Sequence, residues 1–560
     1  MKPTNQLRYG LFLNGPHLQA WEVECLKELE ALSPAPELCF ILYRQDMPEY
    51  SAEHSSWWKR FQKIGSSKVL YYYFLKYFFR SQAQKPVDCT ERFKNIPSLT
   101  VAPIKKEKGS EHFPEEALTA LKSAQPDFML RFGFNILGGE ILDIPKHGVW
   151  SFHHDDEMKY RGSPPCFWEI YKADPVTGAV LQKLTPRLDG GKILKKGYFK
   201  TIDHSYSENL DQVLWETSKW PAYVCKNLDS IVPVLTNSTA PIVRIPKNSE
   251  TLVFALKLFF NQIKNRFQHW FLSEKWNIGI IAKPIQDSLK SNFLTNILDL
   301  NLSSWQKFYA DPFGVKTGDS FQILAEKFDY RSFQGSLVSL SLKNRKVVEE
   351  KITGIDTATH LSYPYLFEEN GSYYCIPESL TNNEVCLYKA VQFPNRWEKV
   401  ATLLNDFQGI DATLIRDNGK YWLFAMDGRN SARMNLYVFY SDSLTGPFSP
   451  HALNPVKSDI RSSRPAGTPF FHQNKWYRPA QNCSQTYGGS IVMNEIETLT
   501  ETEFSEREVS TLNPISGTGF SKGMHTLSPL GNYTLIDGKT HTFIPAVFLK
   551  VLKTRFAGAP

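Results

Sequence analysis

The chain has 560 residues, too many for one hydrophobic core, so we expect two to four domains. Hydrophobic residues make up 42% of it and charged residues 22%, a balance that is typical of globular proteins and excludes a disordered chain. The net charge of +7 is mild for this length and no dense basic tract is present, so the composition argues against a nucleic-acid partner and fits an anionic substrate or a membrane surface.

Strand and helix patterns alternate through the first part of the chain. We expect strands at 8–15, 38–45, 97–104, 126–134 and 147–154, and helices at 18–32 and 114–124. Strands separated by helices predict right-handed βαβ units and a parallel sheet. In such sheets a ligand site lies at the carboxyl ends of the strands.

Two segments, 68–80 and 251–276, are aromatic and basic at once. In the second, apolar residues recur at helical spacing, namely Leu252, Leu256, Phe259, Ile263, Phe267 and Trp270. The polar residues between them are Lys257, Asn261, Lys264 and Gln268. This pattern predicts an amphipathic helix. We favour a helix packed between domains, and the alternative is an interfacial helix that holds the protein near a lipid-linked substrate.

From about residue 285 onward, short strands alternate with Asn-Gly and Pro turns, and a repeat emerges. Its clearest copies are 363–379, 411–427 and 468–482, with looser copies at 311–329 and 525–537. Each copy is a strand, a turn and a second strand that opens with aromatic residues. A period near 50 residues with several strands per copy is typical of a β-propeller, and five copies predict five blades. A generic β-sandwich is the alternative.

The stretch "HGVWSFHHDDEMKYRGSPPCFWEIY", from His147 to Tyr171, places two histidines and three acids at the end of a strand. His153 and His154 are adjacent, so they point to opposite faces of a strand and cannot hold one metal ion. We therefore expect no metal here. An ordinary core histidine is the alternative interpretation for either residue.

The same stretch, with "TGAVLQKLTPRLDGGKIL" (177–194), resembles the formyltransferase family, which includes methionyl-tRNA formyltransferase and sugar N-formyltransferases. The residues in register are Gly148, His153, Tyr160, Arg161, Gly162, Thr177, Gly178 and Asp189. The resemblance covers about residues 5–200. It implies a Rossmann-like α/β fold and 10-formyltetrahydrofolate as the formyl donor, with Phe134, Asn135, Ile136 and Leu137 as donor-binding residues.

Carried over from the family, His153 and Asp189 match the catalytic histidine and aspartate. Ser151 stands where the family has a catalytic asparagine, and losing one donor of an oxyanion hole costs ~3 kcal/mol. A positioned imidazolium stabilises the oxyanion that forms when an amine attacks a formyl carbon. A nearby carboxylate orients that ring and raises its pKa, or accepts the proton of the amine. The predicted substrate-binding residues of this domain are His154, Asp155 and Arg161.

Aligned copies of the repeat make five positions equivalent: Asp311, Tyr363, Asp411, Thr468 and His525. A propeller places such positions around one funnel, so we predict Asp311, Asp411 and the nearby Glu378 as catalytic. Tyr363, Arg464 and His525 are predicted to bind substrate. Ala-Asp-Pro at 310–312 and the five predicted blades resemble the arabinanase and invertase superfamily of glycoside hydrolases. The motifs "YADPF", "IPES", "GIDATL" and "SRPAGTPF" resemble more closely the N-terminal domains of plant glucosamine inositolphosphorylceramide transferases.

The eight cysteines are scattered without a Cys-x-x-Cys pair, which predicts neither a zinc ribbon nor a disulfide framework and suits a reducing compartment. The N-terminus lacks the apolar segment of a signal peptide, and no apolar run approaches the ~20 residues of a spanning helix. We therefore expect a cytoplasmic protein, in peripheral contact with the inner membrane surface if the interfacial helix is real.

Together these patterns predict a formyltransferase-like α/β domain (1–200), a helical connector (201–284) and a five-bladed β-propeller (285–560). The first hypothesis is formyl transfer from 10-formyltetrahydrofolate to an amino sugar in surface-glycan or glycolipid biosynthesis, with the propeller binding the carbohydrate. The second is a glycosyltransferase or glycosidase that acts through the propeller, with a degenerate formyltransferase domain. A carbohydrate-binding protein without catalysis is a third. The expected partners are an amino sugar, a nucleotide sugar or a lipid-linked glycan.

Overall fold

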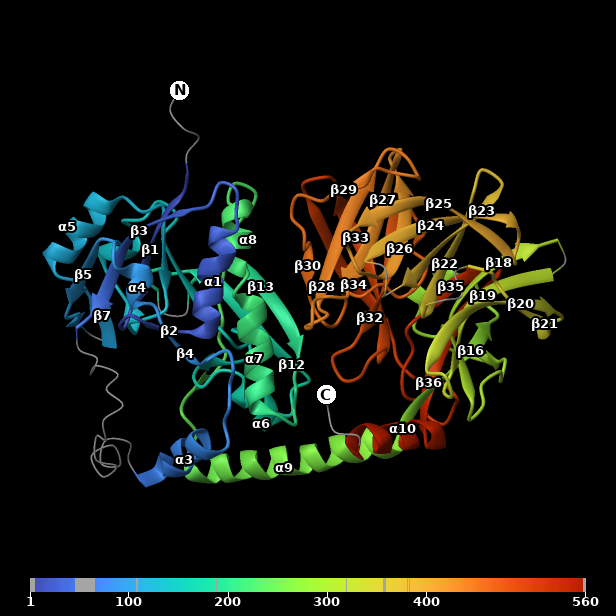
Figure 1. Ribbon diagram of the computed structural model, residues 1–560, viewed down its shortest axis with the longest axis horizontal. Helices are drawn as coiled ribbons and strands as arrows, with labels where there is room; N and C mark the ends of the chain where they lie inside the picture. Colours follow the sequence, from blue (N-terminus) through green and yellow to red (C-terminus); the bar gives the residue numbers. More distant parts are fainter. Residues whose placement is uncertain are drawn as a thin grey trace. The chain divides into compact units, whose positions relative to one another are not determined.

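The computed structural model describes residues 6–45, 66–106, 109–187, 190–318, 320–355, 359–379, 381 and 383–556. The chain divides into two compact units, Met1–Gln262 and Ile263–Pro560 (Figure 1). The division falls inside one long helix. The predicted connector 201–284 is thus shared between the two units, since its first helices belong to the first unit and its last strand belongs to a sheet of the second.

The first unit is built on an eight-stranded sheet with the order β14-β13-β12-β10-β8-β1-β3-β5. Its strands are β1 (Arg8–Leu13), β3 (Glu37–Arg44), β5 (Ser98–Val101), β8 (Phe128–Arg131), β10 (Val149–His153), β12 (Val176–Lys183), β13 (Lys192–Lys200) and β14 (Val234–Leu235). The five strands predicted from the sequence pair in parallel, as expected, because helices connect most of them. The remaining three continue the sheet in antiparallel fashion.

Helices cover both faces of this sheet (Figure 1). They are α1 (Ala20–Glu30), α4 (Thr90–Phe93), α5 (Glu115–Ala124), α6 (Phe167–Lys172), α7 (Tyr206–Thr217) and α8 (Trp220–Lys226). The core on the α5 side includes Phe12, Leu42, Leu121, Met129 and Val149. On the other side α1 packs against α7 and α8. Small sheets pair β2 (His17–Gln19) with β4 (Pro86–Asp88), β11 (Arg161–Gly162) with β15 (Ile242–Val243), and β7 (Ser110–His112) with β6 (Ile104–Lys105) and β9 (Ile136–Leu137).

The second unit consists of successive antiparallel sheets. In chain order the first four-stranded sheet is β18 (Lys307–Thr317), β19 (Ser320–Asp329), β20 (Gln334–Lys343) and β21 (Lys346–Ile352). The next is β22 (Leu361–Glu369), β23 (Ser372–Ser379), β24 (Glu384–Gln392) and β25 (Arg396–Asn405). The third is β26 (Gly409–Asp417), β27 (Lys420–Asp427), β28 (Asn435–Ser441) and β29 (Ser449–Pro450), with β30 (Lys457–Ser458) on β28.

The fourth sheet is β31 (Phe470–His472), β32 (Lys475–Asn482), β33 (Ser490–Leu499) and β34 (Phe504–Leu512). The fifth joins the two ends of the unit, because β16 (Ser273–Ile281) and β17 (Leu298–Asp299) pair with β36 (Tyr533–Thr542) and β35 (Leu527–Leu530). A first and a last segment sharing one sheet is the arrangement of a propeller-like fold, in which the ends hold each other in place.

The repeat predicted from the sequence has a common backbone feature. Asp311, Tyr363 and Asp411 have φ values of 52°, 43° and 50°, and each lies at a register shift near the start of the first strand of its sheet. The left-handed region is costly for residues other than glycine and is retained where the surroundings fix it, often at functional sites. The three sheets therefore have the same left-handed backbone conformation at the equivalent position of their first strands.

Helix α9 (Asn248–Phe271) carries the predicted apolar stripe, and α3 (Val69–Tyr77) packs beside its first turns, with Phe74 against Phe254. Leu252, Leu256, Phe259, Ile263 and Phe267 of the stripe are exposed. The expectation that the stripe is packed between domains is therefore wrong for these residues. None of the described helices, which also include α10 (Pro545–Phe556), combines the length and the apolarity that crossing a bilayer requires.

Candidate functional site

The end of β10 presents two faces. Ser151 and His153 share the face that looks toward the α5 side, and Ser151 is paired in the sheet with Arg131 of β8. Nε2 of His153 lies 3.1 Å from the carbonyl oxygen of Tyr160. A carbonyl only accepts, so this nitrogen carries the proton and the ring orientation is set by the motif's own loop.

His154 faces the other way, as alternation along a strand requires. Its ring stacks on Phe152 and meets Trp21 of α1 edge-on, and its Nε2 lies 3.1 Å from the hydroxyl of Thr217. Burial, with the nearby His153, lowers the pKa of His154 to about 3, so the ring is neutral. The structure thus separates the predicted substrate residue His154 from His153 and places it among core side chains.

Arg131 is a residue of this face that the sequence did not single out. Its Nε donates to the hydroxyl of Ser151 at 2.9 Å, and its Nη1 donates to the carbonyls of Phe134 and Asn135. Burial lowers the pKa of this guanidinium, which Glu111 opposes. A cation therefore lies beside the position where the related family has an asparagine. The signal in the sequence was an arginine at the end of an otherwise apolar strand.

Among the acids that follow the two histidines in the sequence, Asp155 has its partners inside the protein. Asp155 is buried and accepts a hydrogen bond from the backbone N–H of Cys166 at 2.7 Å. Burial and the neighbouring Glu169 raise its pKa well above the ordinary value, and burial raises the pKa of Glu169 to about 8. Two buried carboxyls side by side cannot both ionise cheaply, so they hold a proton at neutral pH. Asp155 therefore belongs to the interior.

The remaining residues predicted in this unit are dispersed. Arg161 lies in β11, and its Nη1 is 3.5 Å from the carbonyl of Ser238. Asp189, the predicted catalytic aspartate, lies outside the described residues. In the predicted donor-binding loop, the backbone N–H groups of Phe134 and Asn135 already bond the side chains of Asn14 and Glu111.

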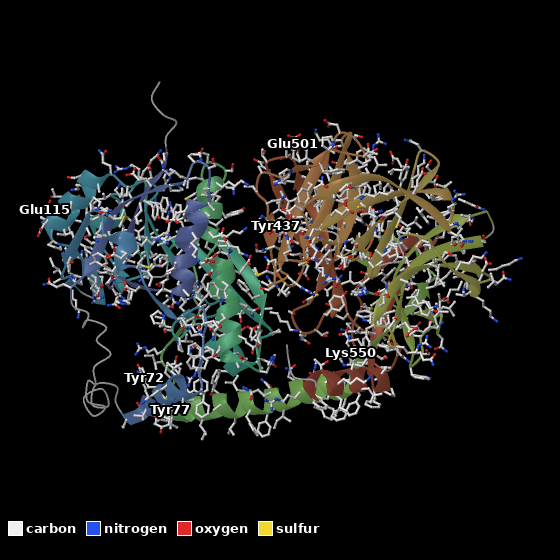
Figure 2. All side chains as sticks on the ribbon, viewed as in Figure 1. Tyr72, Tyr77, Glu115, Tyr437, Glu501 and Lys550 are labelled. Atoms are coloured by element: carbon white, nitrogen blue, oxygen red, sulfur yellow. The ribbon has the colours of Figure 1, made fainter. Side chains whose placement is uncertain are left out.

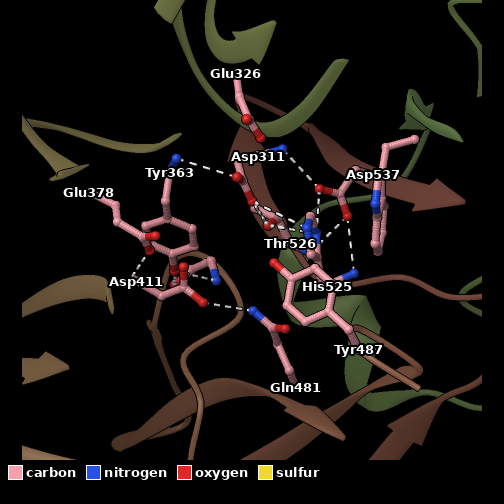
Figure 3. Close-up of polar contacts among 12 residues, drawn as sticks. Asp311, Glu326, Tyr363, Glu378, Asp411, Gln481, Tyr487, His525, Thr526 and Asp537 are labelled. Carbon is pink, nitrogen blue, oxygen red and sulfur yellow. Dashed lines mark hydrogen bonds and ion pairs between the residues drawn. The ribbon is translucent and has the colours of Figure 1, made fainter. Parts of the chain in front are cut away.

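The second unit gathers carboxylates from different sheets (Figure 3). Asp311 accepts hydrogen bonds from the hydroxyl of Thr526 at 2.8 Å and from the backbone N–H of Tyr363. His525 bridges two acids, with Nδ1 2.6 Å from Asp537 and Nε2 3.7 Å from Asp311. Burial raises the pKa of Asp311 to about 6, against the charge of His525. Burial alone would lower the pKa of His525, and the carboxylates outweigh it and raise it.

Asp411 and Glu378 form the neighbouring part of this cluster. Asp411 accepts from Nε of Arg464 at 2.6 Å and from the amide of Gln481 at 2.8 Å, while its backbone N–H donates to Glu378 at 3.0 Å. Burial and the charge of Asp411 raise the pKa of Glu378 to about 8, against Arg464. The predicted residues Asp311, Asp411, Glu378, Arg464 and His525 are thus brought together by the fold.

Three ionisable members of the cluster were missed in the sequence. Asp537 comes from β36, and Glu326, whose pKa burial raises strongly, comes from β19. Tyr487 is 36% exposed and lies over Arg464, with 4.7 Å between ring centroid and guanidinium carbon. By contrast the hydroxyl of Tyr363 is buried, and it accepts from the N–H of Gly467 at 2.7 Å, which is a structural bond. Thr468 bonds the backbone of Leu527.

This arrangement suits acid and base chemistry. Glu378 keeps a proton near neutral pH, Arg464 is bonded to Asp411, and Tyr487 offers a partly exposed ring. The donor atoms of Asp311, His525 and Asp537 lie within 4.8 Å of one another, which is compatible with a cation. In the structure the ring of His525 lies between the two carboxylates. Its raised pKa favours the protonated ring, which supplies the positive charge there.

Comparisons with known proteins divide the chain in the same way. Residues 78–223 match the family model "Formyl transferase", and residues 283–523 match "Glucosamine inositolphosphorylceramide transferase 1, N-terminal". The chain thus joins a region similar to formyl transferases to a region similar to the N-terminal part of these glycolipid transferases.

Two relatives represent the two regions. The chain is 36% identical over 209 residues to glucosamine inositolphosphorylceramide transferase 1 of Oryza sativa subsp. japonica, covering 36% of this chain and 28% of the relative. It is 33% identical over 123 residues to methionyl-tRNA formyltransferase of Clostridium perfringens (strain 13 / Type A), covering 22% and 38%. The match therefore spans well under half the length of these curated relatives.

Two solved structures match part of the chain at low identity. Zg3597, a family 117 glycoside hydrolase of Zobellia galactanivorans, has a TM-score of 0.32 and 13% identity, covering 48% of this chain and 91% of its own. Glycinamide ribonucleotide transformylase 1 from Symbiobacterium toebii has a TM-score of 0.26 and 11% identity, covering 39% and 84%.

Proposed function

We propose that the first unit transfers a formyl group from 10-formyltetrahydrofolate to the amine of an amino sugar in surface-glycan or glycolipid biosynthesis. The observation that carries the proposal is the shared face of Ser151, His153 and Arg131 at the carboxyl ends of parallel strands, inside the region that matches formyl transferases. We infer that the five sheets of the second unit are blades of a five-bladed propeller that binds the carbohydrate.

The residues at the end of β10 and β8 suit this reaction. The bound donor supplies the formyl carbon as an electrophile. His153 is oriented by the Tyr160 carbonyl, and Arg131 adds a fixed cation beside Ser151. Arg131 stabilises the negative charge that develops on the formyl oxygen, and His153, whose Nε2–H donates to Tyr160, adds a second N–H at Nδ1 as an imidazolium. Buried donors are worth several kcal/mol in this task. Arg131 thereby supplies the donor that the family obtains from asparagine. The proton of the attacking amine is assigned to Asp189.

The loop Phe134–Leu137 is the part of the chain that would hold the donor. Two of its N–H groups are already satisfied by Asn14 and Glu111, while the side chain of Ile136 is 44% exposed. The exposed Ile136 side chain therefore fits a flat ring system through apolar contact.

Calorimetric titration of the full chain with 5-formyltetrahydrofolate, a stable analogue of the donor, tests the proposal. We expect micromolar binding (~8 kcal/mol) that weakens in His153→Ala and Arg131→Ala. Incubation with 10-formyltetrahydrofolate and an amino-sugar nucleotide should release tetrahydrofolate in the wild type but not in these variants. Lys159→Ala, an exposed change in the same motif, is the matched control. No binding at about 1 mM would overturn the proposal.

A second candidate is favoured by the proton on Glu378. A carboxyl with a pKa of about 8 beside Asp411 and Arg464 is suited to protonate a leaving sugar oxygen. In this case the second unit is a glycosyltransferase or glycosidase. Glu378→Gln should then abolish turnover of a nucleotide sugar while binding of the formyl donor to the first unit is unchanged. Retained turnover in Glu378→Gln would rule this candidate out.

A cytoplasmic location is part of the proposal. All eight cysteines are free, which fits a reducing compartment. The acceptor we propose is a nucleotide sugar or a lipid-linked glycan, whose phosphates suit the net charge of +7.

A further inference from the structure

The amphipathic helix α9 has its faces reversed relative to an ordinary surface helix. Its protein-facing side includes the buried Phe254 and Leu258, but also polar side chains: Lys257 donates to the carbonyl of Tyr171, and Asn261 donates to the carbonyl of Asp203 at 3.0 Å. The larger apolar stripe points to solvent. A helix that docks partly through polar groups and exposes its main apolar face needs a partner for that face.

The exposed stripe is long and continuous along one helix. It comprises Leu252, Leu256, Phe259, Phe260, Ile263 and Phe267, of which Phe260 is 62% exposed. These residues recur at intervals of three and four, which places them on one side of a helix with about 3.6 residues per turn. Beside the first turns of α9, helix α3 exposes Tyr72, Tyr73 and Tyr77, and Phe78 directly after it is exposed too. Tyr72 and Tyr77 are labelled in Figure 2. Tyrosine rings at such an edge are typical of membrane interfaces.

The charge around the stripe is of one sign. No acidic residue occurs in α3 or in α9 after Glu250. Lys264 and Arg266 are exposed and flank the stripe on its two sides, and Lys76 is exposed on α3. A protein partner with an apolar groove would not require cations along both borders, whereas an anionic bilayer surface attracts each of them.

The same helix continues into the second unit, where it forms a groove with α10. The groove has a volume of about 570 Å³ and is lined by Arg266, His269, Trp270, Lys550, Val551 and Thr554. It contains two permanent cations and no acid, next to a tryptophan. Phosphate groups bind to such cations, and apolar chains bind to the aromatic and valine walls.

We propose that α9, with α3 beside it, is a membrane-docking face that inserts its apolar stripe into the interfacial layer of an anionic bilayer. The occupant to which we commit is the lipid surface itself, with phosphate headgroups at Lys264, Arg266 and the groove. This goes beyond the catalytic proposals, since none of these residues belongs to either candidate site. It would place the active sites next to a lipid-linked glycan.

Vesicle sedimentation of the full chain tests the proposal. Wild type should bind vesicles of phosphatidylcholine and phosphatidylglycerol in equal parts, and bind phosphatidylcholine alone more weakly. Leu256→Glu/Phe260→Glu should weaken binding roughly ten-fold or more, because two apolar anchors are lost and two repelling charges are gained. Lys264→Glu/Arg266→Glu should abolish the preference for anionic vesicles.

The matched control is Val348→Glu/Val391→Glu, which alters two exposed valines on β21 and β24 and should bind as wild type does. Circular dichroism of all variants checks that the fold is retained. If wild type does not bind anionic vesicles, the proposal is wrong. If it instead forms a dimer in sedimentation equilibrium that Leu256→Glu/Phe260→Glu dissociates, a second copy covers the face and the lipid proposal is equally overturned. Donor binding measured in the same samples reports on the formyl site independently.

Discussion

Neighbouring side chains at the end of β10 have opposite surroundings and therefore different chemistry. His153 lies on the face of Ser151 and Arg131, while His154 is neutral and packed against Trp21. The separation of the two histidines was predictable, because side chains alternate along a strand. Arg131 was not, since it lies 20 residues earlier and meets Ser151 only through the pairing of β8 with β10.

The buried pair Asp155 and Glu169 gives a prediction about stability and pH. The pKa of Glu169 is raised to about 8, so the folded protein retains a proton that the unfolded chain loses at a lower pH. The contribution of the protonated Glu169 to the free energy of unfolding is fully present at low pH and is lost as the pH rises toward about 8. Glu169→Gln, which removes this titration, should stabilise the first unit relative to wild type at about pH 8 by on the order of 1–3 kcal/mol, and less at about pH 5.

Thermal unfolding of both proteins at the two pH values measures this difference. Glu91→Gln alters an exposed carboxyl of the same unit and should show little dependence on pH. A difference between Glu169→Gln and wild type that shrinks as the pH rises would contradict the assignment.

At the scale of elements, the strands that open the sheets of the second unit share one geometry. The aligned residues Asp311, Tyr363 and Asp411 all have left-handed backbone at a register shift. Their equivalence was readable from the period of the repeat. Asp537 and Glu326 were not predicted, because they lie on strands that meet the cluster only after the sheets assemble.

Tyr363 ties these sheets together, which gives a second prediction. Its hydroxyl accepts from the N–H of Gly467 and bonds the hydroxyl of Thr413, so it links β22, β26 and the loop before β31. Tyr363→Phe leaves a buried N–H unpaired and should lower the free energy of unfolding by about 1–3 kcal/mol. Tyr373→Phe, a half-buried neighbour on β23, is the control for denaturant unfolding. Equal losses in the two variants would refute the role of the bond.

The whole molecule consists of two units that each have hydrophobic cores of their own. Leu42 belongs to the core of the first unit and Leu324 to a core of the second, and both are fully buried. Separate cores are expected to unfold as separate cooperative transitions, as in most multidomain proteins.

Calorimetry of two cavity variants tests this expectation. Leu42→Ala and Leu324→Ala should each destabilise one unit by about 2–5 kcal/mol and lower one transition, leaving the other in place. Because the sites lie in separate cores that share no side chains, the double variant should show both shifts added. A single transition that both substitutions lower would show that the units unfold as one.

By itself the sequence determined the periodic features of this protein: the parallel βαβ strands, the repeat near 50 residues, the alternation that separates His153 from His154, and the amphipathic pattern of 251–276. These follow from local sterics and hydrophobic spacing, which a chain carries in its order of residues. Only the tertiary structure decided which face of α9 is exposed, that Arg131 meets Ser151, and that Asp537 and Glu326 join the acids of the repeat. The physical reason is that burial and charge pairing depend on strands and helices that are distant in sequence, and no periodicity encodes those neighbours.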